Sequence, residues 1–205
     1  MFITIEGIDG SGKTTQSGRL ADWLTERTGH ETIRTFEPGG CEECAELRRV
    51  ILEGRNFSPE AELLLFLADR AEHVSKVILP AIREGKNVVC ERWNESTIAY
   101  QSGGHKLPPD RVNALITACA FPEPDAKIFL DIPPQTALTR ILSRAKHDKF
   151  EDEGLTLMRK VSDSYRDLAR IGELMRIDCE GLNEHEVFSA ITSALEGVSE
   201  LWQSR

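Results

Sequence analysis

The chain has 205 residues, of which 40% are hydrophobic and 29% are charged, and its formal net charge is −9. This length and balance suit one α/β domain with a single core over residues 1–205. Proteins that bind duplex nucleic acid usually carry a basic face, so the acidic balance argues against a nucleic-acid partner. No apolar run approaches the roughly 20 residues of a membrane span. Because Glu6 also interrupts the N-terminal run too early for a signal peptide, we expect a cytoplasmic protein without membrane contact.

The five cysteines are an odd number without a repeating framework, so we expect reduced thiols. Cys41 and Cys44 form an isolated Cys-x-x-Cys pair. A structural zinc site would need a second pair of ligands, and none follows at the usual spacing. A metal or redox role stays open as the minor alternative, and coincidence is the favoured interpretation.

Taken in chain order, the first elements alternate between strand and helix. An apolar stretch at 2–6 predicts a buried strand that ends at Gly7. Helical spacing of apolar residues follows over 13–27, and a second strand is expected at 32–36. A short helix should cover about 45–52.

A long helix is predicted to begin near Ser58, because serine is a good N-cap and Pro59 suits the first helical turn. Its apolar stripe continues to about Gly85, with a kink expected at Pro80. A third strand then covers 87–91.

The second half of the chain repeats this alternation. The predicted elements are helices near 95–101 and 109–120, a strand over 126–132, helices over 135–147 and 150–171, a short strand near 174–178 and a last helix at about 184–200. Strands that alternate with helices predict βαβ units, and hence a doubly wound, five-stranded parallel sheet of the α/β class.

The strongest motif is the segment from Gly7 to Thr14, which matches the complete pattern G-x-x-x-x-G-K-[ST] between a predicted strand and a predicted helix. In that position, backbone N–H groups and the helix N-terminus can surround the phosphates of ATP. Lys13 is expected to bridge the β- and γ-oxygens, and the Thr14 hydroxyl to coordinate Mg²⁺. No Asn-Lys-x-Asp segment for guanine recognition follows, which disfavours a GTPase. The predicted ATP-binding residues are Gly7, Ile8, Asp9, Gly10, Ser11, Gly12, Lys13, Thr14 and Thr15.

Polar residues also follow the next two strands, at the edge where open α/β sheets bind ligands. Glu37-Pro38-Gly39-Gly40 follows the second strand, although an ordinary turn has the same composition. Glu91 and Arg92 end the third strand. The carboxylate can hold Mg²⁺ and the arginine can bind an acceptor phosphate, with a structural salt bridge as the alternative.

Phe66 and Arg70 lie four residues apart on the long helix and therefore share a face. Phe66 can stack on a base while Arg70 bonds its carbonyl edge, although Phe66 alone is more typical of a core. Further along, Arg140, Arg144 and Lys149 belong to a mixed-charge stretch. This stretch is either a solvated connection or a lid, near 143–153, that brings a cation to the moving phosphoryl group.

In this order and spacing, these segments resemble the motifs of bacterial thymidylate kinases over roughly residues 3–170. The motifs are the Gly7–Thr15 loop, Glu37-Pro38-Gly39-Gly40, Phe66-Leu67-Ala68-Asp69-Arg70, Glu91-Arg92, Ser96-Thr97 with Ala99-Tyr100-Gln101, and Leu130-Asp131. The resemblance implies a P-loop NTPase fold of the nucleoside monophosphate kinase type. It also implies transfer of the ATP γ-phosphoryl group to dTMP, Mg²⁺ and a homodimer.

The resemblance further implies roles for individual residues. Asp9 would bond the deoxyribose 3′-hydroxyl, Arg92 the acceptor phosphate, and Tyr100 would pack below the sugar. The implied substrate-binding residues are Asp9, Glu37, Arg48, Phe66, Arg70, Arg92, Thr97, Tyr100 and Gln101, and the implied metal residues are Thr14 and Glu91. No arginine occurs in Gly7–Thr15, so the family's lid version is implied. The catalytic set is then Asp9, Lys13, Arg92, Arg144 and Lys149, with Arg140 as a further candidate.

The chain departs from the family pattern at three places. Glu91-Arg92-Trp93 stands where Asp-Arg-Tyr or Asp-Arg-His is usual, Cys41 replaces a threonine, and Lys149 replaces an arginine. Two alternatives therefore stay open, namely another deoxynucleoside or deoxynucleoside-monophosphate kinase, and a nucleotide-binding regulator without turnover. Arg48, Arg70 and Arg92 together favour an acceptor that already carries a phosphate.

Overall fold

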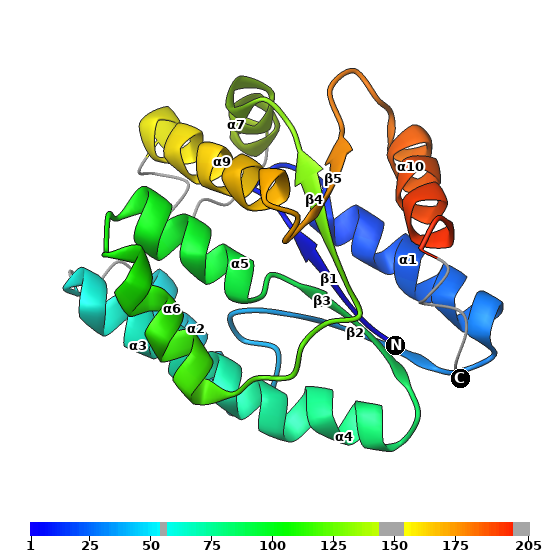
Figure 1. Ribbon diagram of the computed structural model, residues 1–205, viewed down its shortest axis with the longest axis horizontal. Helices are drawn as coiled ribbons and strands as arrows, with labels where there is room; N and C mark the ends of the chain where they lie inside the picture. The colour runs from blue at the N-terminus through cyan, green and yellow to red at the C-terminus, as the bar shows by residue number, and fades with distance from the viewer. Residues whose placement is uncertain (54–56, 144–153, 199–205) are drawn as a thin grey trace.

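The sheet that organises the molecule is parallel throughout (Figure 1). The computed structural model describes residues 1–53, 57–143 and 154–198. Its strands are β1 (Phe2–Glu6), β2 (Thr32–Phe36), β3 (Asn87–Glu91), β4 (Ala126–Asp131) and β5 (Met175–Asp178), in the spatial order β2-β3-β1-β4-β5. The five-stranded parallel sheet and the α/β class expected from the sequence are thereby confirmed.

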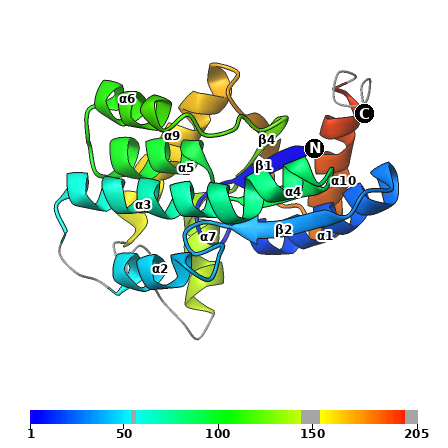
Figure 2. The same cartoon turned by 90° about the horizontal axis from the view of Figure 1, so that it is seen from below.

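Helices cover both faces of this sheet. They are α1 (Lys13–Thr28), α2 (Cys44–Leu52), α3 (Pro59–His73), α4 (Leu79–Arg83), α5 (Asn94–Thr97), α6 (Pro109–Cys119), α7 (Pro134–Leu142), α9 (Gly154–Arg170) and α10 (Glu184–Glu196). Figure 1 shows α1 and α10 on one side of the sheet and α4, α5 and α9 on the other, and Figure 2 shows α1 and α4 on opposite sides of β2. Within the described ranges, no helix combines the length and apolar character needed to cross a bilayer.

The central strand β1 is buried on both sides because successive side chains point to opposite faces. Ile3 and Ile5 pack with Leu20 against α1. Phe2 packs on the other face, with Trp93 after β3. Glu6 has the same parity as Phe2, so its carboxylate enters the layer of α5 and α9.

The order of strands also fixes where a ligand can bind. After β1 the chain turns into α1 on one face, whereas after the neighbouring β3 it turns into α5 on the opposite face. The two connections diverge and leave a crevice at the carboxyl ends of these strands, where open α/β sheets bind ligands.

The long helix differs in detail from its prediction. Ser58 caps α3 as expected, accepting a bond from the Ala61 N–H at 3.3 Å. Before Pro80, however, the helix widens into a π-helical segment, η1 (Val74–Ile78), and continues as α4. Pro80 has no N–H to donate to the preceding turn, so the hydrogen-bond pattern shifts there.

Two other predicted helices also change character. The helix expected at 95–101 is the short α5 followed by a second π-helical segment, η2 (Ile98–Gly104). α7 ends at Leu142, and the predicted lid lies, apart from Ser143, outside the described residues.

Candidate active site

The loop between β1 and α1 closes tightly against the rest of the chain. Gly10 has a φ of +81°, and a Cβ atom at this position would lie 2.6 Å from the Ala137 carbonyl oxygen, so only glycine fits. Gly12, with a φ of +98°, is the N-cap of α1. The Lys13 ammonium group donates to the carbonyl oxygens of Gly7 and Ile8, both at 2.9 Å. The motif thus forms a compact turn that carries its lysine at the start of the helix.

This loop forms one wall of a cavity of about 510 Å³. The predicted site residues that line it are Asp9, Gly10, Gly12, Lys13, Thr14, Thr15, Glu37, Arg48, Phe66, Arg70, Glu91, Arg92, Thr97, Tyr100 and Gln101. Gly7, Ile8 and Ser11 are buried beside it, and Arg144 and Lys149 lie outside the described residues. Nearly all of the described residues that the sequence nominated therefore meet in one place.

Asp9 and Arg92 form an ion pair inside the cavity. The Arg92 Nη2 group donates to Asp9 Oδ1, and the same carboxylate oxygen lies 3.7 Å from Lys13 Nζ. The Arg92 guanidinium also lies over the Tyr100 ring, 5.0 Å from its centroid. Burial alone would raise the pKa of Asp9, but Arg92 and Lys13 outweigh it and hold this pKa below its usual value. Asp9 is therefore an ionised acceptor between two cations.

The backbone of Arg92 is held in an unusual conformation. Its φ is +71°, a left-handed value that residues other than glycine rarely adopt. The Arg92 N–H donates to the Ile5 carbonyl oxygen at 3.0 Å, which ties the turn to the end of β1. Such strain is typical of functional sites.

Lys13 is buried, and its charge is only partly compensated. Burial first, and then the nearby Arg92, lower its pKa to about 8. An anion placed in the cavity would relieve both effects, since it would favour the charged amine. The site is thus suited to a negatively charged ligand.

Thr14 and Glu91, the two predicted metal residues, are adjacent. The Thr14 hydroxyl donates to Glu91 Oε2 at 2.8 Å. The other carboxylate oxygen accepts bonds from Ser17 Oγ at 2.7 Å and Arg34 Nη2 at 3.0 Å. A hydroxyl and a carboxylate oxygen side by side are the donors that Mg²⁺ prefers, so the residues fit this ion. The salt bridge considered as the alternative for Glu91 is also present, with Arg34.

Arg70 is committed to protein partners more fully than the sequence suggests. Its Nε group donates to Glu37 Oε2 at 2.6 Å and its Nη1 group to Thr97 Oγ1 at 2.9 Å. Further bonds join the guanidinium to Asn94 Oδ1 and the Trp93 carbonyl oxygen. Phe66, one turn before, is half-buried in the cavity wall. Arg70 therefore anchors the wall beside any ligand that stacks on Phe66.

The segment after Glu37 contains a disulfide bond. Cys41 and Cys44 are bonded, with their Cα atoms 5.0 Å apart, whereas Cys90, Cys119 and Cys179 are free thiols. The expectation of five reduced cysteines is therefore wrong for this pair. Cys44 begins α2, and a separation of three residues around one turn brings the two sulfur atoms together.

Sequence reasoning missed several residues near the cavity. Arg34, Phe36 and Ser96 line it without having been assigned a role. Glu6, just outside, contacts Ser96 Oγ at 2.5 Å. The available signal was a charged residue inside a predicted strand, which applies to both Arg34 and Glu6.

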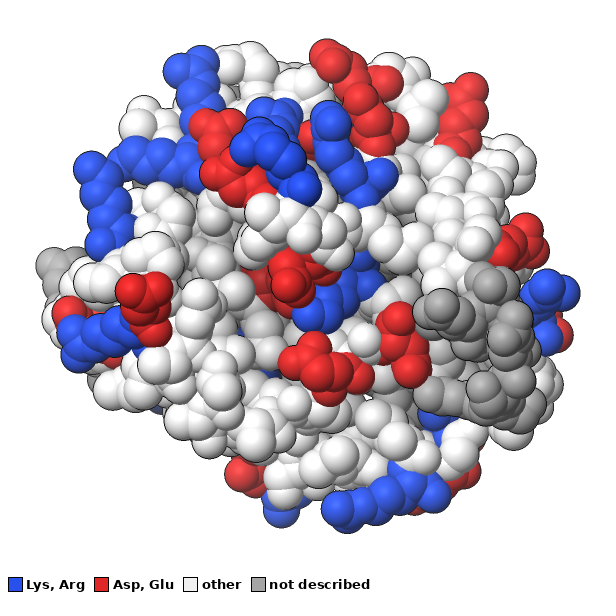
Figure 3. Space-filling view, in the orientation of Figure 1, with Lys and Arg blue, Asp and Glu red and all other residues white. Residues whose placement is uncertain are grey.

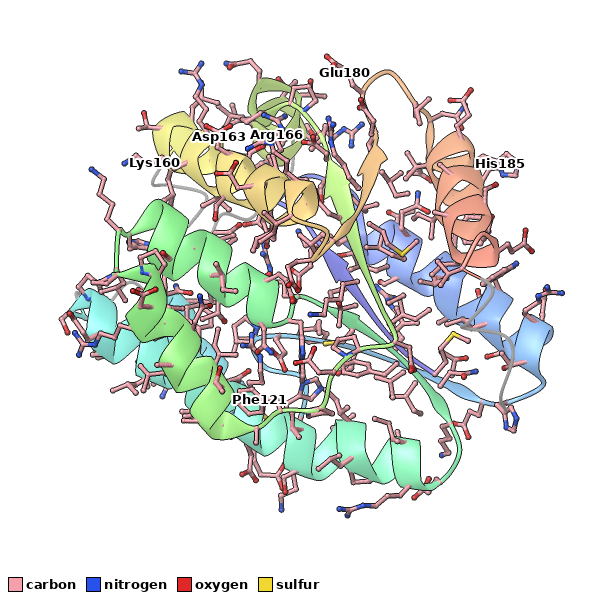
Figure 4. The ribbon with its side chains drawn as sticks, in the orientation of Figure 1. Phe121, Lys160, Asp163, Arg166, Glu180 and His185 are labelled. Atoms are coloured by element: carbon pink, nitrogen blue, oxygen red, sulfur yellow. A yellow bond between two sulfur atoms is a disulfide. The ribbon has the colours of Figure 1, made fainter. Side chains whose placement is uncertain are left out.

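Charged residues outside the cavity are interspersed by sign on the face shown in Figure 3. Figure 4 shows Asp163 and Arg166 on α9, where Arg166 Nη2 donates to Asp131 Oδ1 at 3.0 Å.

Among the lid candidates, Arg140 on α7 donates to the Gly10 carbonyl oxygen at 3.3 Å. One of the three predicted cations thus touches the phosphate-binding loop.

Comparison with known proteins agrees with this architecture. The family model described as thymidylate kinase matches residues 5–191. A probable thymidylate kinase of Pyrococcus horikoshii is 47% identical over 86% of both chains, and a thymidylate kinase of a Jannaschia species is 42% identical over 83% of both. A crystal structure of thymidylate kinase from Ehrlichia chaffeensis aligns with a TM-score of 0.76 and 30% identity, covering 96% of this chain and 98% of that one. This chain belongs to the thymidylate kinase family.

Proposed function

We propose that the chain is a dTMP kinase, which transfers the γ-phosphoryl group of ATP to dTMP and yields dTDP and ADP. The observation that carries the proposal is a single cavity that contains both Lys13 of the phosphate-binding loop and the ion pair between Asp9 and Arg92. Family membership supports the same reaction. The protein would act by aligning donor and acceptor and by neutralising charge, because phosphoryl transfer needs little covalent help.

On the donor side, the loop from Gly7 to Thr15 would hold the phosphates of ATP. The lowered pKa of Lys13 supports this role, since the β- and γ-oxygens would supply the negative charge that the buried amine lacks. Thr14 and Glu91 would hold Mg²⁺, which would offset negative charge on the phosphate oxygens.

On the acceptor side, Arg92 would bind the phosphate of dTMP, with Glu37 and Arg48 nearby, and Asp9 would accept a bond from the 3′-hydroxyl. The ionised state of Asp9 supports its role as an acceptor. The base would stack on Phe66. The remaining walls of the nucleoside pocket would be formed by Arg70, Thr97, Tyr100 and Gln101.

The lid, the assembly and the location complete the proposal. Residues 1–205 would form one kinase domain, with a lid at about 143–153 that supplies Arg144 or Lys149 to the transferring group. Arg140 is a further candidate because it already contacts Gly10. The enzyme would act in the cytoplasm as a homodimer, with the long helix α3 as its proposed interface.

A coupled assay of ADP formation with ATP and dTMP tests this proposal. Lys13→Ala should lower turnover by roughly two to three orders of magnitude, because one preorganised cation at the phosphates is lost. Lys86→Ala is the matched control, since Lys86 pairs with Glu31 and Glu84 away from the cavity. A folded Lys13→Ala protein as active as the Lys86→Ala protein would refute the phosphate-loop assignment.

A further inference from the structure

A buried carboxylate lies directly behind the arginine that faces the cavity. Glu6 ends β1 and has no exposed surface. Its Oε2 atom accepts bonds from Ser96 Oγ at 2.5 Å and from Tyr165 OH at 3.2 Å. The Ser96 oxygen in turn accepts from Arg92 Nη1 at 3.4 Å. A continuous hydrogen-bonded path therefore leads from Glu6 to Arg92.

The second oxygen of this carboxylate is unusual. Glu6 Oε1 is buried and has no hydrogen-bond partner among the described residues, and the same holds for Glu95 Oε2. The other oxygen of Glu95 accepts from Lys127 Nζ at 2.7 Å. An unpaired buried carboxylate oxygen is costly when the group is ionised, and a proton on it removes much of that cost.

Positively and negatively charged groups both surround Glu6. Burial first, and then the charge of Glu95, raise the pKa of Glu6 to about 7, while Ser96, Arg92 and Arg70 act in the opposite direction. The titratable or charged groups that face it from the packed elements are Arg70, Cys90, Arg92, Glu95, Tyr165 and Lys13. Glu6 is thus balanced between its two protonation states near neutral pH.

We propose that Glu6 is a positioning residue for Arg92, and that binding of the acceptor phosphate is coupled to protonation of the Glu6 carboxyl group. The phosphate would add negative charge beside Arg92 and so disfavour the ionised carboxylate behind it. The proton comes from the buffer, and no covalent bond changes. By reciprocity, protonated Glu6 binds the acceptor phosphate more tightly than ionised Glu6 does.

The inference rests on the proposed role of Arg92, and titration calorimetry tests both separately. dTMP is added to the protein without ATP at pH 7, in two buffers of different ionisation enthalpy, to obtain the number of protons taken up. Wild type should take up about 0.4 proton more per dTMP than Glu6→Gln, if bound phosphate raises the pKa of Glu6 by about one unit. The ionisation of dTMP itself contributes equally to both and cancels.

Two further variants sharpen the comparison. Glu95→Gln removes the like charge beside Glu6, so the pH of greatest proton uptake should move to a lower value. Asp131→Asn is the matched control, a buried carboxylate at the end of β4 that pairs with Arg166 and Arg176, and its proton number should equal that of wild type.

Equal proton numbers for wild type and Glu6→Gln would overturn the inference. Should Glu6→Gln not fold, an unchanged pH of greatest uptake in Glu95→Gln would overturn it instead. Arg92→Gln tests the underlying assignment, because it should bind dTMP at least about tenfold more weakly. Unchanged dTMP affinity in Arg92→Gln would refute the acceptor site, whereas lost affinity together with equal proton numbers would refute only the role of Glu6.

Discussion

Arg70 and Arg92 lie at the same end of the sheet but in different surroundings. The Arg70 guanidinium is 2% exposed and is bonded to Glu37, Thr97 and other protein acceptors. Arg92 is half-buried and lies between Asp9 and the Tyr100 ring. The first arginine therefore stabilises the wall of the cavity, and the second can exchange a protein partner for a ligand.

This difference leads to a stability prediction for Arg70. Arg70→Ala should lower the free energy of unfolding by about 3–5 kcal/mol, because the buried Glu37 loses its arginine partner and keeps the bond with His73. Arg49→Ala removes an exposed arginine that pairs with Glu46 and Glu53, and should change the free energy of unfolding far less, because solvent screens surface ion pairs. Urea unfolding of the two variants measures both effects. Equal losses would show that the Arg70–Glu37 pair adds nothing beyond a surface pair.

Some residues of the cavity were predictable from the sequence, whereas the pairs that they form were not. Lys13, Thr14 and Arg92 were predictable because each belongs to a motif at the end of a predicted strand. The bonds from Arg34 to Glu91 and from Ser96 to Glu6 were not, since they join residues 57 and 90 positions apart. Local patterns carry no information on such pairs.

The strands were predictable almost to the residue, whereas the interiors of two helices, at 74–78 and 98–104, were not. Buried parallel strands are continuous apolar runs bounded by glycine or polar residues, and these are visible in a sequence. The π-helical segments η1 and η2 arise from a shift of hydrogen bonds by one residue, which leaves no comparable pattern. Only Pro80 marked the first of them.

The lid proposed at about 143–153 gives the next prediction. If a cation from this region stabilises the transition state, Arg144→Ala should lower kcat far more than it raises KM, and the same holds for Lys149→Ala or Arg140→Ala if that residue is the one. Steady-state kinetics with ATP and dTMP separate the two parameters. Wild-type kcat in all three single variants would contradict a cation supplied by the lid.

For the whole molecule, the buried carboxylate of Glu6 predicts how stability varies with pH. Its pKa is raised from 4.5 to about 7, so the folded protein binds this proton more tightly than the unfolded chain does. The resulting stabilisation is complete below about pH 4.5 and is lost as the pH rises through about 7. Its size is on the order of 3 kcal/mol at most.

The free energy of unfolding of wild type should therefore fall between pH 5 and pH 8 relative to that of Glu6→Gln, because a glutamine side chain does not titrate. Asp69, whose pKa is raised to about 6 by burial and by Glu37, contributes in the same direction in both proteins and cancels in the comparison. Urea unfolding at the two pH values gives the difference. Parallel changes in wild type and Glu6→Gln would contradict the prediction.

The choice of acceptor distinguishes a dTMP kinase from other nucleotide kinases. ADP formation is measured with ATP and a panel of dTMP, dUMP, dCMP, UMP, a purine monophosphate and thymidine. The expected order has the highest kcat/KM for dTMP and a lower value for dUMP, which lacks the methyl group. dCMP should lie at least about tenfold below dTMP, because the positive charge of Arg70 in the cavity wall disfavours the amino group of cytosine. UMP should lie far below because Tyr100 disfavours a 2′-hydroxyl. A preference for dCMP, for the purine nucleotide or for unphosphorylated thymidine would contradict it.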